Sequence, residues 1–249
     1  MIETKLEGPI GRITLNRPEA HNALDAGGIA RLAEVLADWA GRDELRAVVL
    51  GGTGKSFCSG VSLGDVAGLD FATDNPLTRL CDALEAFPAP TIAALNGGVY
   101  GGGVELALSC DFRVGVTGMR AFAPPAKLGI HYEPAGINRA MTRLGPRMAR
   151  RIFLLAESFE AEALLAAGFL DHLVAPKALE AKVAEIADSL GALAPLAVRG
   201  MKRTILELSR GTLDTAAARE RIAACFASED HAEGLAAQRE RRAPVFRGR

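Results

Sequence analysis

The stretch that decides the fold runs from residue 94 to residue 111 and reads Ala-Leu-Asn-Gly-Gly-Val-Tyr-Gly-Gly-Gly-Val-Glu-Leu-Ala-Leu-Ser-Cys-Asp. The apolar run over residues 91–95 predicts a buried strand, and residues 104–110 have the composition of a buried helix. Glycines ahead of a helix permit backbone angles that other residues cannot adopt, and they let a ligand approach the chain closely. The sequence therefore predicts a strand, a glycine-rich turn and a helix N-terminus in succession.

Glu105 is the one carboxylate inside this predicted helix. Gly102 and Glu105 are three residues apart, so on a helix they share one face. The free N–H groups of a first helical turn attract negative charge. This pattern would place an anion-binding amide and a proton-transfer group beside the same small space. The alternative is that the glycines only allow tight helix packing and that Glu105 lies at a solvated helix end, since the GxGxxG spacing of a dinucleotide site is absent.

A second unit of the same kind lies upstream. Residues 46–50 are strand-like and run into Gly51-Gly52-Thr53-Gly54-Lys55-Ser56-Phe57-Cys58-Ser59-Gly60-Val61-Ser62-Leu63-Gly64-Asp65. Two such units suggest parallel strands whose loops gather at one end, where open α/β folds bind ligands. The segment is no phosphate-binding P-loop, because Val49 stands where that motif requires its first glycine. Neither Ser59 nor Ser62 lies in the GxSxG turn of a serine nucleophile.

The rest of the chain alternates strands and helices before it becomes helical. Strands are predicted over residues 8–16 and 112–116, and extended structure over 168–174. Helical spacing marks residues 29–39, 77–87, 137–144, 148–156 and 160–167, and from Leu179 onward the chain is almost entirely helical. We therefore predict an α/β fold, with a core over residues 1–190 and a C-terminal helical region over residues 191–249.

Composition excludes several classes of function. The chain has 249 residues, 49% hydrophobic and 24% charged, which is typical of a soluble globular protein. A net charge of −1 without blocks of like charge argues against a nucleic-acid partner. No stretch approaches the roughly 20 apolar residues of a membrane span, and no signal peptide opens the chain. Its four cysteines, Cys58, Cys81, Cys110 and Cys225, form no CxxC pair, so we expect no metal site and a reducing, cytoplasmic location.

Two blocks, Phe57-Cys58-Ser59-Gly60-Val61 and Gly101-Gly102-Gly103-Val104-Glu105, resemble those of the enoyl-CoA hydratase/isomerase (crotonase) family. The resemblance covers essentially the whole chain, because the Ile13-Thr14-Leu15-Asn16-Arg17-Pro18 segment also resembles the N-terminus of that family. It implies a crotonase-like ββα spiral core and a homotrimer or hexamer with the C-terminal helices between subunits. It also implies an acyl-CoA thioester substrate and no cofactor, since coenzyme A is part of the substrate.

The resemblance assigns roles to the two glycine-rich loops. The backbone N–H groups of Val61 and Gly102 would form an oxyanion hole for the enolate of the thioester, a device in which one donor is worth about 10²–10³ in rate. The coenzyme A moiety would lie against Ser59, Gly60, Val61, Ser62 and Leu63. Many relatives carry aspartate where this chain has Ser62.

The proton-transfer groups are only partly matched. Hydratases of this family use two glutamates, and Glu105 fills the place of the first. The second normally lies in a Phe-x-x-Pro-Glu type of sequence, but here residues 122–127 read Phe-Ala-Pro-Pro-Ala-Lys and contain no acid. Glu133 falls where dienoyl-CoA isomerases of the family carry an aspartate, so we expect it to be the second catalytic carboxylate. The alternative is an ordinary surface glutamate.

Three functions remain open on this scaffold. The first is hydration of a 2-enoyl-CoA or movement of its double bond, with Glu105 and Glu133 as acid and base. The second is an acyl-CoA hydrolase that uses the same oxyanion hole and releases an acid. The third is a non-catalytic acyl-CoA-binding relative, which the missing second glutamate favours.

Overall fold

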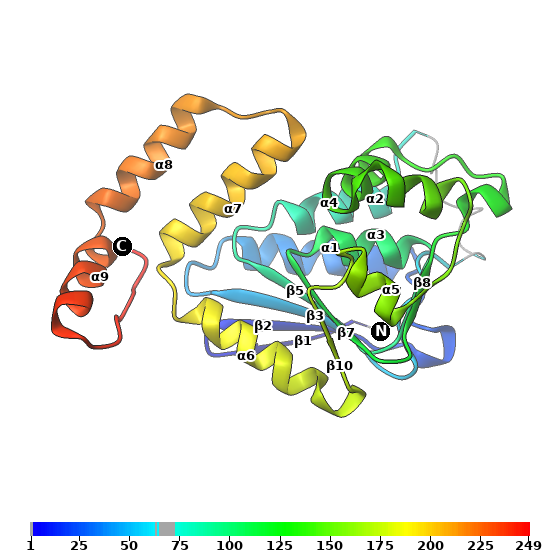
Figure 1. Cartoon of the computed structure of the whole chain (residues 1–249), viewed down its shortest axis with the longest axis horizontal. Helices are drawn as coiled ribbons and strands as arrows, with labels where there is room; N and C mark the ends of the chain where they lie inside the picture. The colour runs from blue at the N-terminus through cyan, green and yellow to red at the C-terminus, as the bar shows by residue number, and fades with distance from the viewer. Residues whose placement is uncertain (1, 63, 65–72) are drawn as a thin grey trace.

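A six-stranded sheet forms the centre of the computed structural model, which describes residues 2–62, 64 and 73–249 (Figure 1). In spatial order its strands are β1 (Ile2–Glu7), β2 (Ile10–Leu15), β3 (Ala47–Gly52), β5 (Thr91–Leu95), β7 (Phe112–Val116) and β10 (His172–Val174). The β1–β2 pair is antiparallel and every later pair is parallel. Every residue of β5 is buried, which explains its continuous apolar sequence.

A second, smaller sheet places the glycine-rich loops. It contains β4 (Ser56–Cys58), β6 (Gly98–Tyr100), β8 (Arg120–Phe122) and β9 (Phe159–Glu160), in that order. Three helices complete the repeating pattern, namely α2 (Pro76–Glu85), α3 (Gly102–Ser109) and α4 (Pro134–Phe153). The chain thus runs through β3-β4-α2, β5-β6-α3 and β7-β8-α4, and each unit advances one strand along both sheets. This order confirms the predicted α/β fold with a ββα spiral core.

Helices cover both faces of the large sheet. The helix α1 (Ala26–Ala40) lies with α2 and α3 on one side, and α6 (Leu179–Gly191) covers the other side (Figure 1). The predicted helical spacing in α1 holds, because Ile29, Leu32, Leu36 and Trp39 are all buried. Short elements join these layers, namely η1 (Pro18–Ala20), η3 (Pro125–Leu128), α5 (Ala161–Ala166) and η4 (Pro176–Ala178).

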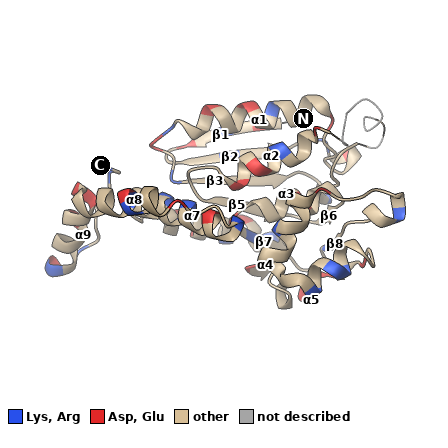
Figure 2. Ribbon diagram, turned by 90° about the horizontal axis from the view of Figure 1, so that it is seen from above, with Lys and Arg blue, Asp and Glu red and all other residues tan. Residues whose placement is uncertain are grey.

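The C-terminal third of the helical structure forms an arm. Its helices α7 (Pro195–Arg210), α8 (Thr215–Ala227) and α9 (Glu229–Glu240) reach away from the sheet (Figure 1). Acidic and basic residues both occur along the arm (Figure 2), and several of its large apolar side chains are exposed, including those of Ile205 and Phe226. The helical character predicted from Leu179 onward is confirmed, whereas the division after residue 190 stays a prediction.

The glycine-rich segments differ from prediction in detail. The strand predicted over residues 91–95 is confirmed, but α3 begins at Gly102 and the intervening strand β6 was not predicted. The helices predicted over 137–144 and 148–156 form one element, α4, with a break at Gly145, where φ is +79°. The segment after β3 forms strand β4, which agrees with the exclusion of a P-loop. In the part of the chain that the structure describes, no helix has both the length and the apolar character to cross a membrane.

Candidate functional site

The two glycine-rich loops meet backbone to backbone. Gly60 has a φ of +86°, and a Cβ added to it would lie 2.5 Å from the nitrogen of Gly102. A Cβ at Gly103 would lie 2.3 Å from the carbonyl oxygen of Cys58. Glycine is therefore required on both sides, because any side chain would separate the end of β4 from the start of α3. The contact brings Val61 and Gly102, predicted from the sequence to act together, into one place.

The backbone N–H groups of Val61 and Gly102 make no hydrogen bond among the residues that the structure describes. The loop after β4 is fixed to Leu24, whose N–H donates to the carbonyl of Gly60 (2.8 Å) and whose carbonyl accepts from Ser62 (2.9 Å). The N–H of Val61, between these two bonds, has no acceptor among the described residues. Gly102 is the first residue of α3, where a backbone N–H has no partner within the helix.

The rest of the predicted coenzyme A loop is held by side chains. Ser59 is half-buried and its hydroxyl donates to the carbonyl of Ala20 (3.3 Å). The thiol of Cys58 accepts from the N–H of Gly60 (3.3 Å), and burial raises the pKa of this thiol to about 12, so it stays protonated. Ser62 is half-buried, and Leu63 lies outside the described residues.

Asn22 fixes the segment that leads into this loop through side-chain hydrogen bonds, and it was not predicted as a site residue. Its side chain is 1% exposed, and its Nδ2 donates to the carbonyls of Thr53, Ser56 and Phe57 at 2.8–3.1 Å. Its backbone is left-handed, with φ of +56°, a conformation that asparagine tolerates better than most residues. A lone asparagine in a loop carries no sequence signal for this role.

Glu105 lies one turn into α3 and is almost completely buried, at 4% exposure. Its Oε1 accepts from Nη1 of Arg139 at 2.7 Å, and Tyr132 also donates a hydrogen bond to this carboxylate. Burial raises the pKa of Glu105 above its ordinary value, against the opposing effects of Arg139 and Tyr132. A Cβ added at Gly136, in the first turn of α4, would lie 3.0 Å from the carboxyl carbon of Glu105.

Glu133 stands at the beginning of the same helix α4. It is the N-cap residue and is half-buried, and its side chain caps none of the helix amides. No hydrogen bond or ion pair of its carboxylate occurs among the described residues. Glu105 contacts the first turn of α4 and Glu133 opens that turn, so the structure brings the two predicted carboxylates to one helix N-terminus. Ala126, where the family's second glutamate is missing, lies in η3 and is exposed.

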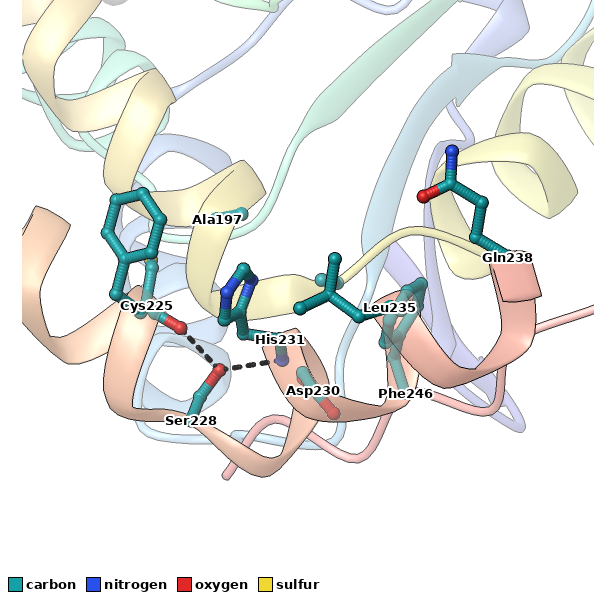
Figure 3. A pocket seen from close by; sticks show the side chains of 11 residues that line it. Ala197, Cys225, Ser228, Asp230, His231, Leu235, Gln238 and Phe246 are labelled. Carbon is teal, nitrogen blue, oxygen red and sulfur yellow. Dashed lines mark hydrogen bonds between the residues drawn. The ribbon is translucent and has the colours of Figure 1, made fainter. Parts of the chain in front are cut away.

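A separate cavity of about 290 Å³ lies within the arm, between α7, α8, α9 and the C-terminal segment (Figure 3). Its polar groups are engaged in helix ends: Ser228 donates to the carbonyl of Cys225 and accepts from the N–H of His231. Asp230 accepts from the backbone N–H groups of Arg247 and Gly248. None of its lining residues belongs to the predicted site. Within the described residues there is also no cluster of three or more His, Cys, Asp or Glu that could hold a metal ion.

Comparison with known proteins gives a consistent result. The model of a family described as enoyl-CoA hydratase/isomerase matches residues 5–249. The short-chain-enoyl-CoA hydratase of Clostridium acetobutylicum is 31% identical over 243 residues, which cover 95% of this chain and 93% of that protein. The 2,3-dehydroadipyl-CoA hydratase of Escherichia coli is 33% identical over 242 residues, covering 95% and 94%. A solved enoyl-CoA hydratase/carnithine racemase from Magnetospirillum magneticum superposes with a TM-score of 0.92 at 31% identity, covering 100% of this chain and 96% of its own.

Proposed function

The chain belongs to the enoyl-CoA hydratase/isomerase family, and from that premise we propose that it hydrates a 2-enoyl-CoA thioester or moves its double bond. One observation carries the proposal: Glu105 stands one turn beyond Gly102, at the point where Gly60 abuts the start of α3. Two amides for an oxyanion and a carboxylate for proton transfer then face one bound thioester. The reaction needs no further cofactor, because the thioester carbonyl itself accepts the electron pair.

Hydration on this site proceeds in two proton transfers. Glu105, as carboxylate, takes a proton from water while the water oxygen bonds to the β-carbon of the enoyl group. The displaced electron pair moves to the thioester oxygen, where the amides of Val61 and Gly102 stabilise the enolate. Glu133 then delivers a proton to the α-carbon, so that the elements of water are added across the double bond. In isomerisation, one carboxylate removes a proton from one carbon and a proton returns at another.

The test is a reaction of a short 2-enoyl-CoA in deuterated water. Loss of the conjugated enoyl absorbance and entry of deuterium at the α-carbon are followed together in wild type, Glu105→Gln and Glu133→Gln. Each substitution is expected to lower the rate about 10²–10⁴-fold, which is the usual contribution of a general acid or base. Glu207→Gln serves as the control, because Glu207 is also buried and ion-paired but lies in α7.

The outcomes separate the three functions that the sequence leaves open. Loss of activity only in Glu105→Gln would return Glu133 to a surface role. A free acid product would establish the hydrolase. If wild type binds the acyl-CoA without hydration or exchange, the result would favour the non-catalytic relative. The buried Glu105–Arg139 ion pair and the absence of an acid at Ala126 are the observations that support this function. Equal activity in all four proteins would refute the assignment of both carboxylates.

We further propose that the protein is a homotrimer, or a hexamer made of two trimers, assembled through the arm. Exposed apolar side chains along α7 and α8 support this: Met201, Ile205, Leu208 and Phe226 are 59–68% exposed, and burial of such side chains drives association. Light scattering after gel filtration should give three or six chains per particle, and Ile205→Asp should lower that number. The four unpaired cysteines fit the cytoplasmic location that the sequence favours.

A further inference from the structure

Arg139 joins the reactive carboxylate to a set of charges that the reaction itself does not use. The Arg139 side chain is 2% exposed, and its guanidinium contacts three carboxylates. Nη1 donates to Glu105 at 2.7 Å, Nη2 donates to Asp82 at 2.5 Å, and Nε lies 3.3 Å from Glu85. A planar guanidinium that is held at both ends has one orientation, so the hydrogen bond to Glu105 has one direction.

The two outer carboxylates are held in turn by the arm. Asp82 and Glu85 are three residues apart on α2 and therefore share a face. Arg210, the last residue of α7, donates to Glu85 at 2.5 Å and to Asp82 at 3.2 Å. Oδ1 of Asp82 thus accepts from Arg139 and Arg210 together. A polar cavity of about 280 Å³ adjoins this cluster, between α2, α4 and the end of α7.

We propose that Arg139 is the positioning residue for Glu105, and that Arg210 couples the docking of α7 to the position of that carboxylate. The proposal rests on the proposed function, since it assigns Glu105 a proton to transfer. The charges support it. Three carboxylates (Asp82, Glu85 and Glu105) face three guanidinium groups (Arg139, Arg143 and Arg210). Loss of Arg210 leaves Asp82 and Glu85 to draw Arg139 toward α2 and away from α3.

The consequence for chemistry follows from what surrounds Glu105. The groups that face it are Arg139 and Tyr132 from α4 and the segment before it, and Cys81 and Asp82 from α2. Arg139 is the only cation among them, so it favours the carboxylate form that accepts a proton. When Arg139 moves away from Glu105, its positive charge offsets less of the cost of burying the Glu105 carboxylate. The acid limb of the pH–rate profile, where activity rises as Glu105 loses its proton, must then move to higher pH. The turnover number must fall more than KM changes.

The experiment uses the full-length protein with Arg210→Gln, Arg139→Gln and the control Arg203→Gln. Arg203 also lies on α7 and pairs with a buried glutamate, Glu207, but has no contact with Asp82 or Glu85 among the described residues. We expect Arg210→Gln to lower kcat about 2- to 30-fold, the usual range for a residue that acts through others. KM should stay unchanged, and the acid limb of the pH–rate profile should lie at higher pH. Arg139→Gln should lower kcat about 10²-fold. Arg203→Gln should match wild type.

A second measurement separates this proposal from the proposed function. Glutamate ¹³C-labelled at the side-chain carboxyl is incorporated, and the Glu105 resonance is assigned by its absence in Glu105→Gln. Its titration is then followed by NMR, with no substrate present. A titration at higher pH in Arg210→Gln than in Arg203→Gln supports the coupling even when no enoyl-CoA reacts. Identical Glu105 titrations in these two variants overturn it, whatever the activity, and the Arg210 result stands if Arg139→Gln does not fold.

Discussion

The substitution Gly60→Ala tests the backbone contact on which the proposed oxyanion hole depends. A Cβ at Gly60 would stand 2.5 Å from the nitrogen of Gly102, while ordinary contact begins at 3.4 Å. The loop after β4 and the start of α3 must therefore separate by about 0.9 Å. An oxyanion accepts hydrogen bonds from donors about 2.7–3.1 Å away, so a displacement of this size removes one of the two donors from its range.

The expected magnitude follows from the loss of one donor. The rate of α-proton exchange should fall about 10²–10³-fold. The free energy of unfolding should also fall, by about 1–2 kcal/mol for the left-handed backbone and by about 1–3 kcal/mol more for the overlap with α3. Gly118→Ala is the matched control: its φ is +82°, close to the +86° of Gly60, but no atom lies within 4 Å of the added Cβ.

Deuterium exchange into a saturated acyl-CoA and urea unfolding are measured on both variants and on wild type. Gly118→Ala should lose only the left-handed increment of stability and keep full activity. Gly60→Ala should lose more stability and nearly all exchange of the α-proton. The reactivity of its four cysteine thiols should be the same as in wild type. Two variants with equal activity, or a Gly60→Ala protein with wild-type exchange, would refute the reasoning from the backbone contact.

Three further predictions concern charge and burial. Burial raises the pKa of Glu105 above 4.5 in the folded state, so the folded protein holds the Glu105 proton more tightly than the unfolded chain does. The unfolding free energy of wild type minus that of Glu105→Gln should therefore fall as pH rises from about 4.5. A rise in this difference would contradict the raised pKa of Glu105. Burial raises the pKa of Cys58 and Cys110 to about 12 and raises the pKa of Cys81 well above its ordinary value. One thiol, that of half-buried Cys225, should therefore react quickly with a disulfide reagent at pH 8, and all four should react in denaturant. Asp230→Ala should lower the unfolding free energy by about 1–3 kcal/mol, because it strands the amides of Arg247 and Gly248; limited proteolysis should then cut the C-terminal segment, which wild type should resist.

The parts of the site that the sequence predicts are those with a local signal. The strand over residues 91–95, the glycine-rich turn and the following helix are neighbours in the chain, so composition alone shows their order. Gly60 and Gly103 are required by close backbone contacts, so glycine appears in the sequence of both loops. Strand β6 escaped prediction because three residues, one of them glycine, carry no period.

The parts that could not be predicted depend on distant residues. Arg139 is 34 positions from Glu105 and 57 from Asp82, and nothing in the sequence of α4 distinguishes this buried arginine from the exposed arginines of the same helix. Tyr132 and Glu105 are also far apart in the sequence, so the hydrogen bond between them appears only in the fold. Of the β1–β2 hairpin, strand β1 was not predicted, because most of its residues are exposed and buried and exposed positions do not alternate along it.

The topology explains why the sequence predicts the position of the proposed oxyanion hole better than that of the proposed second acid. Strands β4 and β6 are parallel neighbours, with Ser56 opposite Gly98, so their carboxyl ends meet at one edge and the loops that follow must lie together. Val61 and Gly102 owe their meeting to that pairing, and Glu105 follows because α3 begins where β6 ends. Glu133, proposed as the second carboxylate, has no such constraint. It lies in the segment between β8 and α4, which pairs with no strand among the described residues, so an acid can be absent at Ala126 and present at Glu133 while the two amides keep their places.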